Sequence, residues 1–132
     1  MQYLLDANTV IAAIRGHPNV VRRLSAVAPG DCALSTITRY ELFVGVQKSI
    51  DPVKERAKLD TFINGFNQLP FDDDAAEGAA RVRAYLEAQG MPIGPYDTLL
   101  AGHALSLSLI VVTANVKEFI RVPGLTVENW QI

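Results

Sequence analysis

A chain of 132 residues, of which 49% are hydrophobic and 20% charged, has the composition of a globular protein and not of a disordered one. Twelve basic and fourteen acidic residues give a net charge of −2, which excludes a domain that is basic as a whole, although a local basic patch can still bind nucleic acid. No apolar run approaches the roughly 18 residues of a membrane span, no signal peptide is visible, and the single cysteine, Cys32, cannot form an internal disulfide. We therefore expect one soluble, cytoplasmic domain over residues 1–132 that does not contact a membrane.

Short apolar runs alternate with helical patterns along the chain. In chain order, we predict a strand at 2–5, helices at 8–15 and 19–27, a strand at 32–34, helices at 37–49 and from 51 onward, a strand at 68–71, helices at 75–89 and 96–108, a strand at 109–113, a helix at 115–120 and a strand at 125–127. The apolar stripe of the helix from 51 onward consists of Val53, Leu59, Phe62, Ile63 and Phe66. Strands that alternate with helices indicate an α/β fold, a parallel sheet covered by helices on both faces.

Acidic residues occupy positions where the pattern favours apolar ones. Asp6 directly follows the first apolar run, and Glu41 and Asp97 each share a helix face with apolar residues. An unpaired buried carboxylate costs several kcal/mol, so each of these groups needs a partner, a proton or a cation. Asp6, Asp97, Asn115 and Glu118 also follow or adjoin the carboxyl ends of predicted strands, which meet at one edge of a parallel sheet.

Oxygen ligands without a set of cysteines or histidines favour Mg²⁺ or Mn²⁺ over structural zinc. Such a site activates water and offsets the charge of a phosphodiester in reaction. Simpler roles remain open for each acid. Glu41 could close a capping box with Thr38, Asp97 could cap its own helix, and Asn115 and Glu118 have the spacing of another capping box.

Basic residues occur in small groups along the chain. Arg15, near the end of the first strand, and Lys117 and Arg121, late in the chain, are candidates for contacts with RNA phosphates. The two histidines, His17 and His103, are expected to be surface or packed residues and not ligands.

Four segments occur in a specific order: Leu4-Leu5-Asp6-Ala7-Asn8-Thr9, Ser35-Thr36-Ile37-Thr38-Arg39-Tyr40-Glu41-Leu42, Pro92-Ile93-Gly94-Pro95-Tyr96-Asp97 and Val112-Thr113-Ala114-Asn115-Val116-Lys117-Glu118-Phe119. In this order the chain resembles the PIN-domain ribonucleases, and among them the VapC toxins of bacterial toxin–antitoxin pairs. The resemblance implies a three-layer PIN-like fold with a short-stranded parallel sheet. It extends over nearly the whole chain.

By this resemblance, Asp6, Glu41 and Asp97 are acidic metal ligands, and Glu118 or the position of Asn115 supplies the fourth. Asn8, Thr113 and Asn115 would support the site. Two positions depart from the family pattern, because Ala7 replaces a hydroxyl residue and Ala114 stands where a polar residue is frequent.

The resemblance further implies an Mg²⁺-dependent endoribonuclease, with Mn²⁺ as a substitute, that cleaves RNA by metal-activated water. Transfer RNA is one candidate substrate. The implied partners are a cognate antitoxin, which is a short DNA-binding protein, and a second copy of the chain in a homodimer. The apolar surface for such contacts could come from the helix over residues 53–66.

Two alternatives differ in function. Asp6 and Asn8 after a strand weakly resemble the opening of haloacid-dehalogenase-like phosphatases, in which the first aspartate is a nucleophile. The other alternative is a PIN fold that binds RNA or a partner without catalysis. Acids at all four motif positions argue against the second alternative.

Overall fold

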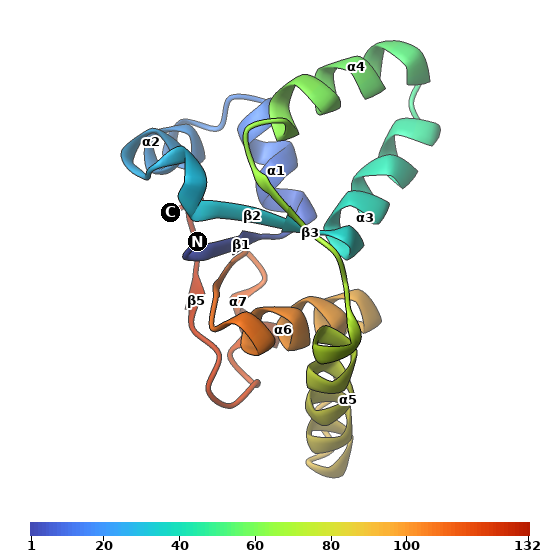
Figure 1. Cartoon of the computed structure of the whole chain (residues 1–132), viewed down its shortest axis with the longest axis vertical. Helices are drawn as coiled ribbons and strands as arrows, with labels where there is room; N and C mark the ends of the chain where they lie inside the picture. Colours follow the sequence, from blue (N-terminus) through green and yellow to red (C-terminus); the bar gives the residue numbers. More distant parts are fainter.

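A five-stranded parallel sheet forms the centre of the computed structural model, which describes residues 1–132 (Figure 1). The strand order is β3-β2-β1-β4-β5. The strands are β1 (Tyr3–Leu5), β2 (Cys32–Ser35), β3 (Asn67–Leu69), β4 (Ile110–Val112) and β5 (Val127–Glu128). All four neighbouring pairs are parallel, as the alternation of strands and helices predicts.

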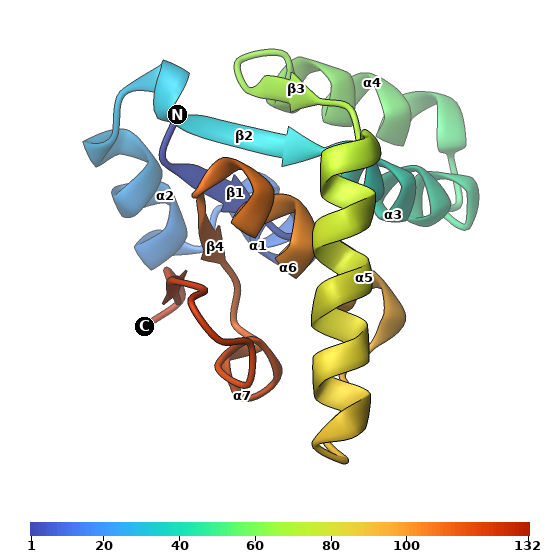
Figure 2. The same ribbon diagram turned by 60° about the horizontal axis from the view of Figure 1, so that its bottom comes forward.

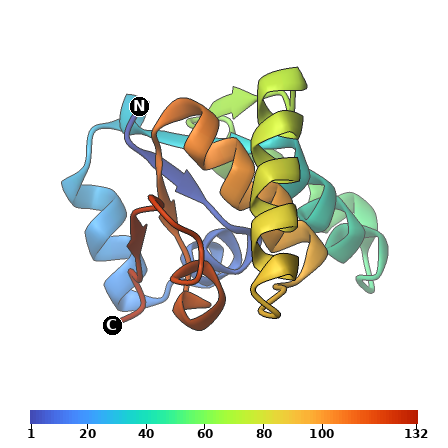
Figure 3. The same cartoon turned by 90° about the horizontal axis from the view of Figure 1, so that it is seen from below.

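Helices cover both faces of this sheet. They are α1 (Ala7–Ile14), α2 (Pro18–Ala26), α3 (Thr36–Gln47), α4 (Pro52–Ile63), α5 (Asp73–Ala88), α6 (Pro95–Leu107) and α7 (Val116–Phe119). Helices α1 to α4 lie on one side and α5 to α7 on the other (Figures 1 and 3). The predicted three-layer α/β fold is therefore confirmed.

The central strand β1 contributes to two separate cores. Leu5 packs in the core beneath α1 to α4, and Leu4 packs in the core beneath α5 to α7. Successive side chains of a strand point to opposite faces, so a strand covered on both sides must be apolar at every position. This requirement explains why the first apolar run ends so abruptly at Asp6, where the strand leaves the core.

The predicted elements agree with the structure to within a few residues, with one exception in the packing. Val53 is 82% exposed, although the apolar pattern places it on the buried stripe of α4. The first turn of α4 lies at the far end of the α3–α4 hairpin, away from the sheet (Figure 1), so Val53 has no core to contact. Leu59 and Ile63, nearer the sheet, are buried as predicted.

Cys32 is buried in β2, as expected for a core residue. Burial, and then the charge of Asp31, raise the pKa of its thiol to about 11. None of the helices combines the length and apolarity that crossing a bilayer requires.

The order of the strands creates a switch point between β1 and β4. The chain moves outward from β1 to β2 and β3, and then returns to add β4 on the other side of β1 (Figure 2). The carboxyl ends of β1 and β4 lie side by side, joined by the hydrogen bond from the Asp6 amide to the Val112 carbonyl (3.0 Å). Open α/β sheets bind ligands at such a point.

Candidate metal centre

Asp6 lies at this switch point, buried between the end of β1 and the start of α1. It is the N-cap of α1, and its Oδ1 accepts a hydrogen bond from the Thr9 amide (2.8 Å). Its second oxygen, Oδ2, accepts no hydrogen bond from the protein. Asp6 is therefore held in place by one oxygen, and the other remains available to a ligand.

Two buried threonines fix the elements around Asp6. The Thr9 hydroxyl donates to the Val112 carbonyl (3.2 Å), which ties α1 to β4. The Thr38 hydroxyl donates to the Leu5 carbonyl (3.3 Å), which ties α3 to the end of β1. These bonds hold both helices against the carboxyl edge of the central strands.

Glu41 projects from the second turn of α3 and is half-buried. Burial, followed by the negative charge of Asp6, raises the pKa of Glu41 above its ordinary value. A capping box between Thr38 and Glu41 does not form, because the N-cap of α3 is Ser35, whose Oγ accepts from the Ile37 amide (3.1 Å). Glu41 therefore does not cap the N-terminus of α3.

Asp97 and Glu118 meet on either side of Asn115. The side-chain nitrogen of Asn115, Nδ2, donates to Asp97 Oδ2 (2.8 Å) and also to Glu118 Oε2. Glu118 Oε1 accepts from the Gly94 amide (2.7 Å). The backbone N–H of Asn115 donates to the Thr113 hydroxyl (2.9 Å), and the supporting role of Thr113 in the centre stays a prediction.

Neither of the remaining capping alternatives holds. Asn115 is the N-cap of α7, but its side chain donates to the carboxylates of Asp97 and Glu118 and makes no hydrogen bond with the backbone of α7. Asp97 lies in the first turn of α6, whose N-cap is Gly94, and makes no capping hydrogen bond. A Cβ atom at Gly94 would lie 3.7 Å from Glu118 Oε1 and 3.9 Å from Asp97 Oδ2, which are ordinary van der Waals distances, so Gly94 lies directly beside both carboxylates.

The charges of these acids influence one another. Burial, a hydrogen bond with Glu118 and the charges of Glu118 and Asp6 together raise the pKa of Asp97 to about 7, although Asn115 opposes the shift. The Gly94 amide, and then Asn115 and Asp97, lower the pKa of Glu118. As the pH falls, Asp97 therefore takes up a proton before Glu118 does.

In this arrangement no three acidic, histidine or cysteine side chains are already close enough together to hold a metal ion. The donor set nevertheless fits a hard divalent cation, since it consists of carboxylate and amide oxygens. Burial, and then the charges of neighbouring acids, disfavour the ionised forms of Glu41 and Asp97, and a bound cation would offset both effects.

The three basic residues that were predicted to contact RNA differ in their surroundings. Arg15 is exposed and lines a hollow of about 550 Å³ together with Glu41 and Lys58. Arg121 donates to the Pro92 carbonyl (3.1 Å), and its charge helps to lower the pKa of Glu118. Lys117 is exposed on α7 without an ion pair. Their contacts with RNA stay a prediction.

Three further positions clarify the family pattern. Asn8 is exposed and its side chain makes no hydrogen bond, so its supporting role also stays a prediction. Ala7 packs in the core beneath α1, and Ala114 is exposed. The missing hydroxyl at Ala7 therefore leaves no unpaired group, and the Thr9 amide holds Asp6 instead.

Thr9 and Gly94 were not predicted as parts of the centre. The spacing of Asp6 and Thr9, which is typical of an N-cap and its third helical residue, is a signal that could have revealed Thr9. The bond from Gly94 to Glu118 joins residues 24 positions apart, and no local pattern reports it.

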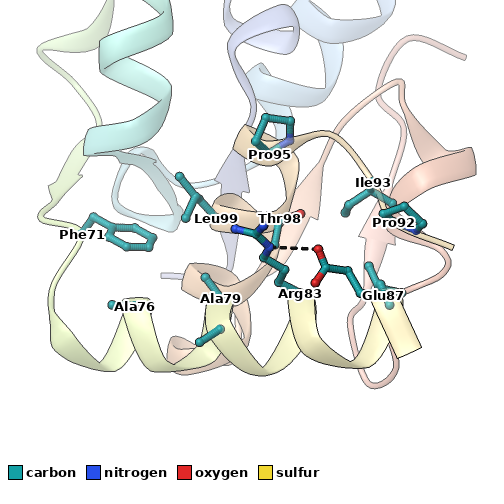
Figure 4. Close-up of a pocket in the computed structure, with 12 residues that line it drawn as sticks. Phe71, Ala76, Ala79, Arg83, Glu87, Pro92, Ile93, Pro95, Thr98 and Leu99 are labelled. Carbon is teal, nitrogen blue, oxygen red and sulfur yellow. Dashed lines mark hydrogen bonds and ion pairs between the residues drawn. The ribbon is translucent and has the colours of Figure 1, made fainter. Parts of the chain in front are cut away.

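A second hollow, also of about 550 Å³, lies between α5 and the start of α6 (Figure 4). Its lining is mostly apolar, with Phe71, Ala79 and Leu99 among its residues. The only charged pair there, Arg83 and Glu87, forms an ion pair within α5 (3.1 Å). This hollow holds no convergent acids and is separate from the metal centre.

The chain is similar to known proteins over nearly its full length. The family model of the PIN domain matches residues 3–125. The "tRNA(fMet)-specific endonuclease VapC" of Salmonella typhimurium is 38% identical over 130 residues, which cover 98% of each chain. "Ribonuclease VapC2" of Rickettsia felis is 36% identical over 132 residues, again covering 98% of each chain.

A solved structure agrees with these relatives. The toxin chain in the DNA-bound VapBC complex from Salmonella typhimurium superimposes with a TM-score of 0.93 at 38% identity, and 98% of each chain is covered. These matches exclude the haloacid-dehalogenase alternative. The chain belongs to the PIN-domain family and, within it, to the VapC ribonucleases.

Proposed function

We propose that this protein is an Mg²⁺-dependent endoribonuclease and the toxin of a toxin–antitoxin pair, with Mn²⁺ as a substitute for Mg²⁺. One observation carries the proposal: at the switch point of the sheet, burial and then the charge of Asp6 and its neighbours raise the pKa values of both Glu41 and Asp97. Asn115 joins Asp97 to the fourth acid, Glu118. A PIN-domain chain that kept its fold only to bind a partner would not need this concentration of costly negative charge.

Each residue has a distinct part in the proposed centre. Asp6 and Asp97 hold the cation from the end of β1 and the start of α6, with Glu41 and Glu118 completing the set. Asn115 orients Asp97 and Glu118 toward each other. When bound, a divalent cation makes water more acidic and offsets the charge on the phosphate. A cation at this position would favour the ionised form of Asp97.

The proposed substrate class is transfer RNA. Two relatives at 38% identity, from Salmonella typhimurium and Shigella flexneri, are named tRNA(fMet)-specific endonucleases. Each of the two matches covers 98% of this chain. We therefore place initiator tRNA first among the substrates to test, and the cytoplasm is the compartment in which the cleavage would act.

The proposed partners are a short DNA-binding antitoxin and a second copy of the chain. Several neighbours are described as VapBC complexes, two of them bound to DNA. Helix α4 borders two hollows, of about 270 and 620 Å³, on its face toward α1 and α2, and Phe62 lines both of them. This apolar face is the candidate docking surface for the antitoxin.

Cleavage assays test the nuclease. Purified protein should cut initiator tRNA with Mg²⁺ or Mn²⁺ and stop cutting in EDTA, and Asp6→Ala and Asp97→Asn should reduce the rate by at least about 10²-fold. Glu77→Gln, which removes an exposed acid of α5 without an ion pair, is the matched control and should cut normally. Binding of RNA without cleavage would favour a non-catalytic PIN module and overturn the proposal.

Expression tests the toxin. Induced synthesis of the wild-type chain should halt growth, whereas Asp97→Asn should not. Co-expression of a short neighbouring gene should restore growth. Normal growth on induction of the active enzyme without that gene would contradict a toxin while leaving the nuclease intact.

A further inference from the structure

Two exposed tyrosines contact each other beside the metal centre. The rings of Tyr40 and Tyr96 lie with their centroids 5.6 Å apart at an angle of 52°, and their hydroxyls are 3.4 Å apart. Tyr40 is 49% exposed and Tyr96 is 42% exposed. Large aromatic side chains are normally buried, because each removes 150–250 Å² of surface from water, on the order of several kcal/mol.

Each tyrosine directly precedes a proposed metal ligand. Tyr40 precedes Glu41 on α3, and Tyr96 precedes Asp97 on α6. The pair therefore bridges the two helices at the level of the acids. A group that rests on these rings would lie beside the metal centre.

Both rings stand on backbone that is firmly held. Helix α3 is anchored by the bond from Thr38 to the Leu5 carbonyl, and the first turn of α6 by the bond from the Thr98 hydroxyl to the Gly94 carbonyl (3.0 Å). A rigid aromatic surface loses little conformational entropy when it binds a ligand, which is the property that a recognition platform needs.

The other aromatic pairs have structural roles. Tyr3 packs edge-on against buried Trp130, and Phe71 packs edge-on against buried His103. Among the aromatic pairs of the protein, the Tyr40–Tyr96 pair is the one in which both side chains are exposed. Packing of the core does not account for them.

We propose that Tyr40 and Tyr96 form a stacking platform for an unpaired base of the RNA, next to the phosphodiester that is cut. This inference rests on the proposed ribonuclease function and adds a substrate-positioning site to it. Bases of single-stranded loops stack on aromatic side chains in many RNA-binding proteins. Such stacking contributes about 1–3 kcal/mol per base and tolerates different bases.

The platform selects RNA by its structure and not by the identity of its bases. A base inside a duplex is already stacked on both faces, so only an unpaired nucleotide can rest on the tyrosines. The phosphate beside that nucleotide would then lie over Glu41 and Asp97, one residue further along each helix. Cleavage is thereby directed to loops and single-stranded segments.

The experiment measures RNA binding and cleavage separately. Binding is followed with a fluorescent RNA hairpin whose seven-nucleotide loop carries 2-aminopurine, in the Asp6→Ala background with Mg²⁺, where cleavage is blocked. Tyr40→Ala and Tyr96→Ala should weaken the affinity by roughly 5- to 150-fold, which corresponds to the stacking energy. They should also abolish the quenching of 2-aminopurine, whereas Tyr40→Phe and Tyr96→Phe should retain both.

Two controls define the effect. Tyr85→Ala removes a tyrosine of similar exposure (45%) from α5 and should bind like the parent protein. In the active enzyme, the Tyr96→Ala variant should raise KM more than it lowers kcat. An abasic nucleotide at the stacked position should weaken binding by the parent protein, and the Tyr96→Ala change should then cost nothing more.

Unchanged affinity in both alanine variants would overturn the platform. A phenylalanine variant as weak as the alanine variant would overturn it as well, since the hydroxyl and not the ring would then matter. Sedimentation velocity decides the competing possibility: alanine variants that dissociate a dimer place the tyrosines in an interface between copies. If the wild-type chain cuts no RNA at all, the failure lies in the proposed function and not in the platform.

Discussion

Gly78 of α5 and Gly102 of α6 touch backbone to backbone where the two helices cross. A Cβ atom on Gly102 would lie 2.1 Å from the Ala79 amide nitrogen, and one on Gly78 would lie 2.6 Å from the Gly102 carbonyl oxygen. No side chain fits between the helices at this point. Because α6 carries Asp97, the crossing also sets the position of one side of the metal centre (Figure 3).

We expect Gly102→Ala to destabilise the protein. The added methyl group forces two packed backbones apart, which typically costs about 1–3 kcal/mol and here exceeds the gain of about 1 kcal/mol in helix propensity. The matched control is Gly45→Ala in α3, where a Cβ meets no atom within 4 Å, and this change should stabilise by about 0.5–1 kcal/mol. Urea unfolding of both variants measures the difference. Equal stability of the two variants would show that the helices can separate without cost.

Asn115→Ala should weaken metal binding without disrupting the fold. Asn115 is the one side chain that bonds to both Asp97 and Glu118, and loss of a group that orients metal ligands typically costs about 10- to 100-fold in affinity or activity. Isothermal titration with Mn²⁺ gives the affinity. Asn64→Ala, at an exposed asparagine without a side-chain hydrogen bond, should bind Mn²⁺ like the wild type.

Mg²⁺ or Mn²⁺ should raise the melting temperature of the wild-type protein. A ligand that binds only the folded state stabilises it by about 2.7 kcal/mol at a hundredfold excess over its Kd. In EDTA above pH 7, Asp97→Asn should melt higher than the wild type, because burial and the neighbouring acids disfavour the ionised Asp97 in the folded protein. The variant should also lose most of the increase caused by metal. An unchanged metal effect in Asp97→Asn would exclude this carboxylate from the ligand set, and Glu77→Gln should respond like the wild type.

His103 should make the protein less stable in mild acid. Burial lowers the pKa of His103, and Asp72 opposes the shift only in part. The Ser35 hydroxyl already accepts from the Ile37 amide, so its proton is free to donate to Nδ1 of a neutral His103 (2.9 Å). The folded state then binds fewer protons than the unfolded state, and stability falls as the pH drops below about 6.5.

The measurement compares the wild type with His103→Gln between pH 7.5 and 5.5. The wild type should lose more of its free energy of unfolding over this interval than the variant does. Asp97 titrates in the same interval with the opposite sign, because its raised pKa favours the protonated folded state, but its contribution is common to both proteins. Parallel curves would mean that His103 accepts a proton without loss of its packing.

Local patterns were sufficient for the sheet, its parallel strands and the acids. The apolar run that stops at Asp6 and the acids on apolar helix faces could be recognised because each pattern lies within a few neighbouring residues. The exposure of Val53 could not, since the periodicity of a helix does not tell how far the sheet extends beneath it. The same holds for Gly102 and for the tyrosine pair, because each depends on a helix that is distant in sequence.

The pairing of β1 with β4 has a consequence during protein synthesis. The bond from Thr9 to the Val112 carbonyl joins residues 103 positions apart, so the first strand waits for its neighbour until most of the chain has been translated. Asp6 and Glu41 leave the ribosome long before Asp97 does. A growing chain therefore carries only half of the proposed metal centre until its last third, which contains Asp97 and Glu118, has emerged.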